Sequence, residues 1–151
     1  MFNYKLFEDN IEDLVEISSC DDFPYRIDRQ EAAIYCNDCI PTSPCIQTYG
    51  VFMDEKLVSV MTATFLFVFP NPDNLTGRIV YISGAYTRPE YRHKGLAKIL
   101  LQAIEKDAKE FFIADYICCD SYADELYLDS GFEFNNKSRL WKVLQYETRR
   151  I

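Results

Sequence analysis

Residues 88–101 (RPEYRHKGLAKILL) place a turn, a glycine and a cluster of positive charge directly before a segment with helical spacing of its apolar residues. The first turn of a helix carries backbone N–H groups that have no partner within the helix, and the helix dipole favours anions at that end. Gly95 has no side chain, so a ligand can approach the backbone closely. The chain has a formal net charge of -8, but this segment is basic. Its basic residues are Arg88, Arg92, Lys94 and Lys98, with His93 among them. We therefore expect an anionic ligand here, with phosphate as the natural candidate.

Strand-like segments, rich in β-branched and aromatic residues, alternate with segments of helical spacing, which predicts a mixed α/β (α+β) fold. Strands are expected at residues 3–7, 46–53, 56–69, 78–87, 115–119, 132–134 and 139–144. Helices are expected at residues 11–18, 28–39, 95–111 and 123–130. The resulting order, β-α-α-β-β-β-α-β-α-β-β, fits one domain over residues 1–151.

The helix expected after Gly95 has the clearest apolar stripe in the chain. Its members are expected to face the sheet: Leu96, Ile99, Leu100, Ala103, Ile104, Ala108 and Phe111.

Residues 92–97 (RHKGLA) have the form R/Q-x-x-G-x-G/A between an expected strand and a long helix. Pro-Glu-Tyr precedes them at residues 89–91, and Leu-Tyr and Gly-Phe follow at residues 126–127 and 131–132. With these features the sequence resembles the GCN5-related N-acetyltransferase (GNAT) superfamily over roughly residues 79–132. The resemblance implies a GNAT domain with a mixed, mostly antiparallel central sheet flanked by helices. It also implies an enzyme that transfers an acetyl group from acetyl-CoA to a primary amine.

The resemblance further implies which residues hold acetyl-CoA. Backbone groups of Ala85, Tyr86 and Thr87 hold the pantetheine arm like an added strand, and one N–H polarises the thioester carbonyl. The N–H groups of the motif hold the pyrophosphate: Arg92, His93, Lys94, Gly95, Leu96 and Ala97. His93, the only histidine of the chain, is accordingly expected to serve anion binding.

Asp120 occupies the place where the family often has an asparagine that binds the pantetheine arm. An ionised aspartate accepts hydrogen bonds and donates none, so Ser121 or Tyr122 are alternatives for this contact. Gly84 either permits the splay that opens the cofactor slot or is an ordinary strand irregularity.

Tyr127 is the catalytic residue that the resemblance implies, because related enzymes commonly place a tyrosine near the thioester sulfur. A phenol with an ordinary pKa of about 10 can protonate a leaving thiolate. The alternative is that Tyr127 packs as an amphipathic aromatic on its helix.

The general base stays open at the level of sequence. Many relatives carry a glutamate on the strand before the phosphate loop, but residues 78–87 contain no acidic residue. Asp21 and Asp22 are candidates, and a reaction without a protein base is the alternative to both.

The acceptor also stays open, among polyamines, aminoglycoside-like amines, free amino acids, and protein N-termini or lysines. Aromatic residues expected near it form either a cage for an organic cation or plain core: Phe23, Tyr25, Tyr35, Tyr49 and Tyr86.

The composition excludes several classes of function. The 24 Asp and Glu against 16 Lys and Arg argue against nucleic acid as the main partner. The longest apolar stretch, residues 60–69, is too short to cross a bilayer, so we expect no membrane partner and a cytoplasmic protein. A homodimer is expected from the resemblance alone.

Six cysteines without a secretory signal are expected to be reduced thiols. Cys36, Cys39 and Cys45 have the spacing of three soft metal ligands, but no histidine lies near them, so no metal is expected. Two alternatives to the enzyme remain: a non-catalytic acyl-CoA-binding regulatory module, and a metal- or redox-responsive protein that uses these cysteines.

Overall fold

The computed structural model describes residues 2–6, 10–39, 45–135 and 138–147, with seven strands in one sheet of order β1-β2-β3-β4-β5-β7-β6. The strands are β1 Phe2–Leu6, β2 Ile46–Met53, β3 Lys56–Phe67, β4 Arg78–Thr87, β5 Tyr116–Cys119, β6 Glu133–Phe134 and β7 Leu140–Val143. Every expected strand is present, and β2 and β4 have the expected bounds. All neighbours are antiparallel except β4 and β5, which run parallel. The predicted α/β fold class is confirmed.

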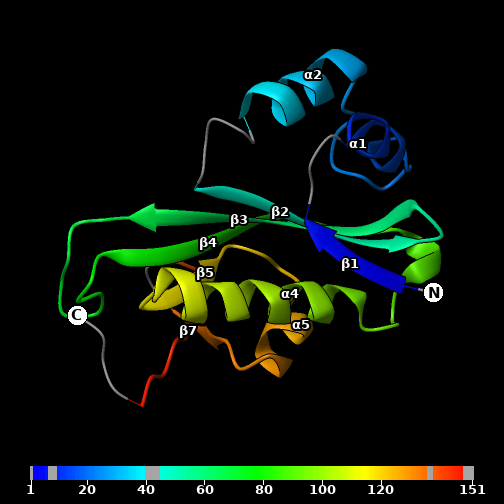
Figure 1. Cartoon of the computed structure of the whole chain (residues 1–151). Coiled ribbons are helices and arrows are strands. Elements are labelled where there is room, and N and C mark those ends of the chain that lie inside the picture. The colour runs from blue at the N-terminus through cyan, green and yellow to red at the C-terminus, as the bar shows by residue number, and fades with distance from the viewer. Residues whose placement is uncertain (1, 7–9, 40–44, 136–137, 148–151) are drawn as a thin grey trace.

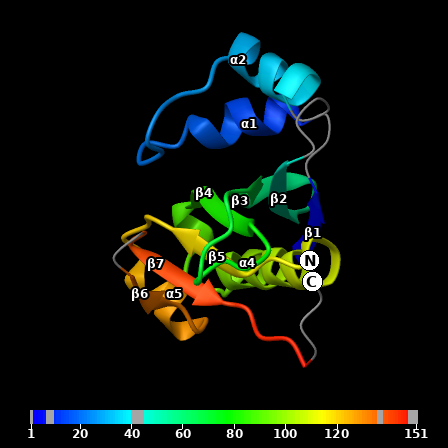
Figure 2. The same cartoon turned by 90° about the vertical axis from the view of Figure 1, so that its left-hand side faces the viewer.

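Two helical layers cover the two faces of this sheet (Figures 1 and 2). The helices α1 Ile11–Ser18 and α2 Arg29–Ile34 lie on one face, and α4 Leu96–Asp107 and α5 Asp124–Asp129 lie on the other. Asp28 begins α2 with a capping box, because its side chain accepts from the Glu31 amide at 2.8 Å and the Glu31 side chain accepts from the Asp28 amide. Short π-helical turns extend α2 over Tyr35–Cys39 and α4 over Ala108–Phe112, and a 3-10 turn forms at Pro89–Tyr91.

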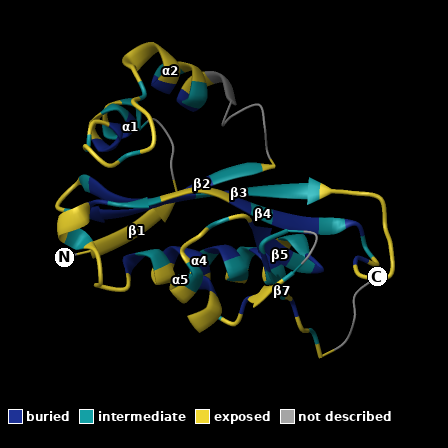
Figure 3. Cartoon of the chain, turned by 180° about the vertical axis from the view of Figure 1, so that it is seen from behind, coloured by how far each residue is buried: buried dark blue, intermediate teal, exposed yellow. Residues whose placement is uncertain are grey.

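Each helical layer closes its own hydrophobic core (Figure 3). The larger core lies between the sheet and α4 and includes Met61, Val80, Leu100 and Ile104. The smaller core lies under α1 and α2 and is built on Leu14, Ile17, Ala32, Phe52 and Leu57. None of the described helices combines the length and apolar character that crossing a bilayer requires.

The apolar stripe of α4 is only partly as predicted. Leu100, Ile104 and Ala108 are buried, but Ile99 is 42% exposed and Phe111 is 79% exposed. Leu101 belongs to the buried face of α4 instead, and Ile99 lies outside that face. Phe111 lies in the π-helical turn, whose wider winding rotates it away from the stripe.

Candidate functional site

The strands β4 and β5 separate into a V at one end of the sheet. Their parallel pairing runs from Ile79 opposite Tyr116 to Ile82 opposite Cys119, while β4 itself continues to Thr87. Gly84 has a φ of +64°, and the pairing of β4 with β3 shifts register beside it. Among the described residues, no strand pairs with positions 83–87 on their β5 side. The backbone groups there can therefore accept an extended ligand as an added strand.

The N-terminus of α4 opens toward this V. Gly95 caps the helix with a left-handed φ of 78°, and His93 has a φ of 61°. The Ile99 amide makes the first internal bond, to the Gly95 carbonyl at 3.1 Å, so the amides of Leu96 and Ala97 have no helix partner. A Cβ atom at Gly95 would meet nothing within 4 Å. The space above these amides is therefore open to an anion.

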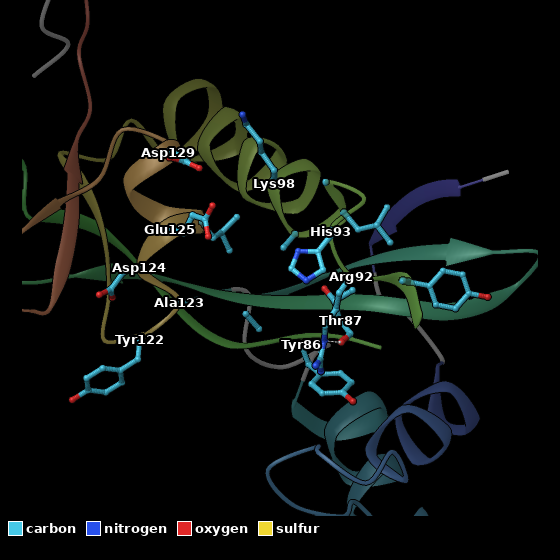
Figure 4. A pocket seen from close by; sticks show the side chains of 16 residues that line it. Tyr86, Thr87, Arg92, His93, Lys98, Tyr122, Ala123, Asp124, Glu125 and Asp129 are labelled. Atoms are coloured by element: carbon cyan, nitrogen blue, oxygen red, sulfur yellow. Dashed lines mark hydrogen bonds between the residues drawn. The ribbon is translucent and has the colours of Figure 1, made fainter. Parts of the chain in front are cut away.

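A cleft of about 830 Å³ joins the free edge of β4 to this helix N-terminus. Figure 4 shows its walls, with His93 and Lys98 on the α4 side and Asp124 and Glu125 on α5. The lining residues are Ala85, Tyr86, Thr87, Tyr91, Arg92, His93, Gly95, Leu96, Ala97, Lys98, Tyr122, Ala123, Asp124, Glu125, Leu126 and Asp129.

Eight of the ten sequence-predicted cofactor residues line this cleft, and Lys94 and Asp120 are not among its lining residues. The wall formed by α5 was not expected in detail. Acidic residues at the start of a short helix are common, so nothing in the sequence singled out Asp124, Glu125 and Asp129.

Arg88 does not belong to the expected anion site. Its side chain is buried, its Nε donates to the Leu57 carbonyl at 2.6 Å, and its guanidinium pairs with Glu16 at 3.3 Å. The expectation that Arg88 contributes charge to the site is wrong, because this side chain fastens β3 to α1.

Arg92 lies at the cleft but already has partners. Its Nε donates to the Thr87 carbonyl at 2.9 Å, and its Nη2 forms an ion pair with Asp22 at 2.6 Å. The Tyr86 hydroxyl donates to the other oxygen of Asp22, and the Phe23 ring lies 4.6 Å from the Tyr86 ring. The loop between α1 and α2 is thereby anchored at the edge of the cleft.

This anchoring bears on the candidate base. The hydrogen bonds from Tyr86 and then Arg92 hold the pKa of Asp22 below its usual range. Because both oxygens of Asp22 already accept strong hydrogen bonds, the carboxylate is a poor proton acceptor. Asp21 is exposed beside it.

The expected aromatic cage forms only in part. Phe23, Tyr25 and Tyr86 cluster, with centroid distances of 4.6 and 5.7 Å from Phe23. The Tyr35 hydroxyl is hydrogen-bonded to Thr48 on β2. Tyr49 is fully buried in the core on the α4 side, where its hydroxyl donates to Asp107 at 2.7 Å. Of the two alternatives for Tyr49, the structure shows plain core, away from any cage.

Tyr127 lies inside the α4-side core and is 1% exposed. Its ring packs 5.2 Å from that of Phe132, and its hydroxyl lies near the side chains of Ser121 and Cys119. Burial raises the pKa of Tyr127, so the phenol keeps its proton. Tyr127 is not among the residues that line the cleft, although its neighbour Leu126 is.

The cysteines give no metal centre in the part of the chain that the structure describes, where no group of three or more His, Cys, Asp or Glu side chains is close enough to hold an ion. Cys36 is buried and Cys45 is exposed. The side chain of Cys39 lies outside the described residues.

Comparisons with known proteins agree with this geometry. The model of the acetyltransferase (GNAT) family matches residues 11–132. A predicted acetyltransferase with acetyl-CoA from Clostridium acetobutylicum superposes with a TM-score of 0.75 at 24% identity, over 91% of this chain and 93% of that one. NAA60 from Arabidopsis thaliana, in complex with a bisubstrate analogue, gives a TM-score of 0.68 at 16% identity, over 93% and 94% of the two chains.

A curated relative matches over a shorter stretch. L-ornithine N5-acetyltransferase NATA1 from Arabidopsis thaliana is 41% identical over 58 residues, which are 38% of this chain and 25% of that protein's length. Since the family model covers most of the chain, including the V and the start of α4, the chain belongs to the acetyltransferase (GNAT) family.

Proposed function

We propose that this acetyltransferase moves the acetyl group of acetyl-CoA to the primary amine of a small molecule or peptide. One observation carries the proposal: the unpaired edge of β4 and the open N-terminus of α4 meet in a single cleft of about 830 Å³. An extended pantetheine arm needs the first of these features, and a pyrophosphate needs the second.

The cofactor residues act mainly through their backbone. Pantetheine lies along Ala85, Tyr86 and Thr87, and the pyrophosphate lies on the amides of residues 93–97. Gly95 lets the phosphate approach, since its Cβ position is empty. Lys98 adds positive charge at the same end of the cleft, and the His93 ring lines that end beside it.

Tyr127 supplies the proton for the departing thiolate in this proposal. Its raised pKa keeps the phenol protonated at neutral pH, and its hydroxyl lies beside Cys119 and Ser121, where the two strands part. The acetyl group of a cofactor held along β4 reaches that same point.

Two observations support an amine acceptor: the net charge of the chain and its similarity to a known N-acetyltransferase. The chain carries a formal net charge of -8, which favours a cationic partner over an anionic one. The relative that is 41% identical over 58 residues is, by its name, an acetyltransferase for the N5 amine of ornithine.

Calorimetry with acetyl-CoA tests the donor site. The wild-type chain is expected to bind, and Gly95→Ala is expected to weaken binding at least about tenfold, because the new Cβ occupies the phosphate position. Gly131→Ala is the matched control, since Gly131 also has a positive φ, of +90°, and its Cβ would meet only the Lys142 side chain. Equal affinity of the two variants would contradict the assignment of the phosphate site.

Release of free thiol over a panel of amines tests the chemistry. Thiol release that requires both acetyl-CoA and an amine supports the transferase. Tight binding of acetyl-CoA without thiol release for any amine would favour the alternative, a non-catalytic acyl-CoA-binding module.

A further inference from the structure

Asp120 stands at the apex of the V. The last paired positions of β4 and β5 are Ile82 and Cys119, and Asp120 is the next residue of the β5 chain. The Tyr81 hydroxyl donates to Asp120 Oδ2 at 3.1 Å, and the Arg139 amide donates to Asp120 Oδ1 at 3.1 Å. The carboxylate is thus held beside the point where the strands separate.

The carboxylate also belongs to the face of the sheet opposite α4. Val80, Ile82 and Cys119 point into the core on the α4 side, so the alternation of the strands puts Tyr81 on the other face. The residues of α1 and α2 cover Phe52, Leu57 and Val60 of β2 and β3, and Asp120 stays exposed. Asp120 is not among the residues that line the cofactor cleft, which suits a contact with the second substrate.

The charge of Asp120 is available to a ligand. No ion pair of Asp120 occurs among the described residues. The guanidinium of Arg139 pairs instead with Asp124, at 2.7 Å, and stacks on the Tyr122 ring at 4.3 Å. The other titratable groups that face Asp120 are the Tyr81 phenol and the thiols of Cys118 and Cys119, all neutral at pH 7 because burial raises the pKa of each.

We propose that Asp120 binds the ammonium group of the acceptor and takes its proton, and that Tyr81 is a positioning residue for this carboxylate. The inference rests on the proposed function and assigns the side from which the amine arrives. A cofactor in the cleft presents its acetyl carbon at the apex of the V from the α4 side. The amine then attacks from the opposite face, where Asp120 and Tyr81 lie.

Transfer of the acetyl group to the ammonium form of the amine releases one proton overall. The ammonium group gives a proton to Asp120, and the neutral nitrogen attacks the thioester carbonyl to form the C–N bond. The C–S bond breaks as the tetrahedral intermediate collapses, and Tyr127 gives its proton to the sulfur to form the thiol of CoA. The second N–H proton then restores the Tyr127 phenol. Asp120 then returns its proton to water.

The variant Asp120→Asn tests the proposal, because the amide has nearly the same size and keeps one acceptor oxygen but lacks charge and basicity. We expect kcat/KM for the amine to fall about 100-fold at pH 7, with partial recovery at higher pH as more of the free amine is neutral. The affinity for acetyl-CoA is expected to stay within about twofold of wild type. Asp54→Asn, in the turn between β2 and β3, is the matched control and is expected to leave both quantities unchanged.

The variant Tyr81→Phe keeps the inference testable if Asp120→Asn does not fold. Loss of one hydrogen bond to the charged carboxylate is expected to lower kcat/KM about fivefold and to move the acidic limb of the pH profile to higher pH. A purely structural role of Tyr81 would lower the thermal midpoint without moving that limb.

The outcomes separate this inference from the proposed function. A wild-type chain that releases no thiol overturns the proposed function and this inference with it. An active wild type with an equally active Asp120→Asn overturns the inference alone. An Asp120→Asn variant that loses acetyl-CoA binding would return Asp120 to the cofactor role expected from the sequence and also overturn the inference.

Discussion

Arg92 and Asp22 form an ion pair of 2.6 Å that joins the loop before α4 to the loop between α1 and α2. Arg92 is the first residue of the motif that we propose binds the pyrophosphate, and Asp22 lies in the loop that carries Phe23 and Tyr25, two aromatic residues expected near the acceptor. Tyr86, which lines the cofactor cleft, shares the same carboxylate. One aspartate therefore links the proposed cofactor region to the region expected for the acceptor.

Removal of this link tests its role. Asp22→Asn is expected to leave the thermal midpoint near the wild-type value, since both side chains are partly exposed, and to raise KM for the amine more than the dissociation constant of acetyl-CoA. Asp21→Asn, one residue away, is the control for a change of charge in the same loop. Equal effects of the two variants on KM would contradict a specific role of Asp22.

The titration of Asp22 gives a second measure of the link. Because hydrogen bonds from Tyr86 and Arg92 lower its pKa, the carboxylate is expected to titrate below its ordinary value of about 3.9 in NMR spectra of the carboxyl carbon. The link contributes stability above the ordinary pKa and loses it as the pH falls through the lowered pKa. Tyr86→Phe and Arg92→Met are each expected to raise this pKa.

Arg88 and Arg92 are expected to differ in their effect on stability. Arg88→Met removes a buried guanidinium that donates to the Leu57 carbonyl and pairs with the exposed Glu16, and we expect the free energy of unfolding in urea to fall by about 2 to 3 kcal/mol. Arg92→Met, at an exposed position, is expected to change the unfolding free energy by less than about 1 kcal/mol. A reversed order would contradict the structural role of Arg88.

Tyr127→Phe is expected to lower kcat about tenfold or more and to leave the dissociation constant of acetyl-CoA nearly unchanged. The hydroxyl is lost but the buried ring still packs on Phe132, so the fold is retained. Stopped-flow measurement of thiol release separates turnover from binding. An unchanged turnover number would remove Tyr127 from the mechanism.

Alkaline pH is expected to destabilise the protein. Burial raises the pKa of Tyr49 and Tyr127, so both phenols stay protonated in the fold and ionise on unfolding above pH of about 10. Above this pH, ionisation of each phenol in the unfolded chain lowers the unfolding free energy by up to about 1.4 kcal/mol per pH unit. Below the ordinary tyrosine pKa the phenols are neutral in both states, so no stability is lost. Urea titrations at pH 8 and 11 are expected to show that the unfolding free energy falls less between these two pH values for Tyr49→Phe than for wild type.

The helices and strands could be predicted because patterns of neighbouring residues specify them. The strands and α4 follow from β-branched runs and apolar spacing, and the turn after Met53 is marked by Asp54 and Glu55, both with a positive φ. The cofactor cleft could be predicted because backbone amides at a helix start need no particular tertiary partner. The single domain, homodimer, cytoplasmic location and lack of nucleic-acid partner stay predictions.

The rest of the site depends on contacts between distant residues. Arg88 and Arg92 are four positions apart, yet one is buried against Glu16, 72 positions away, and the other lies at the cleft. Asp120 owes its position to Tyr81 and Arg139, which are 39 and 19 positions distant. Spacing along the chain carries no signal for such partners.

Beyond Ile82, the edge of β4 that faces β5 has no partner strand in the described part of the chain, and this affects how readily the protein aggregates. A sheet margin with vacant N–H and C=O groups is a template for another chain, and proteins often hide such margins to avoid aggregation. Gly84 lies within this edge, and the cofactor placed along β4 in our proposal would cover it. The cosubstrate would then act as a cap as well as a reagent, and the empty protein should cluster at concentrations at which the loaded protein remains dispersed.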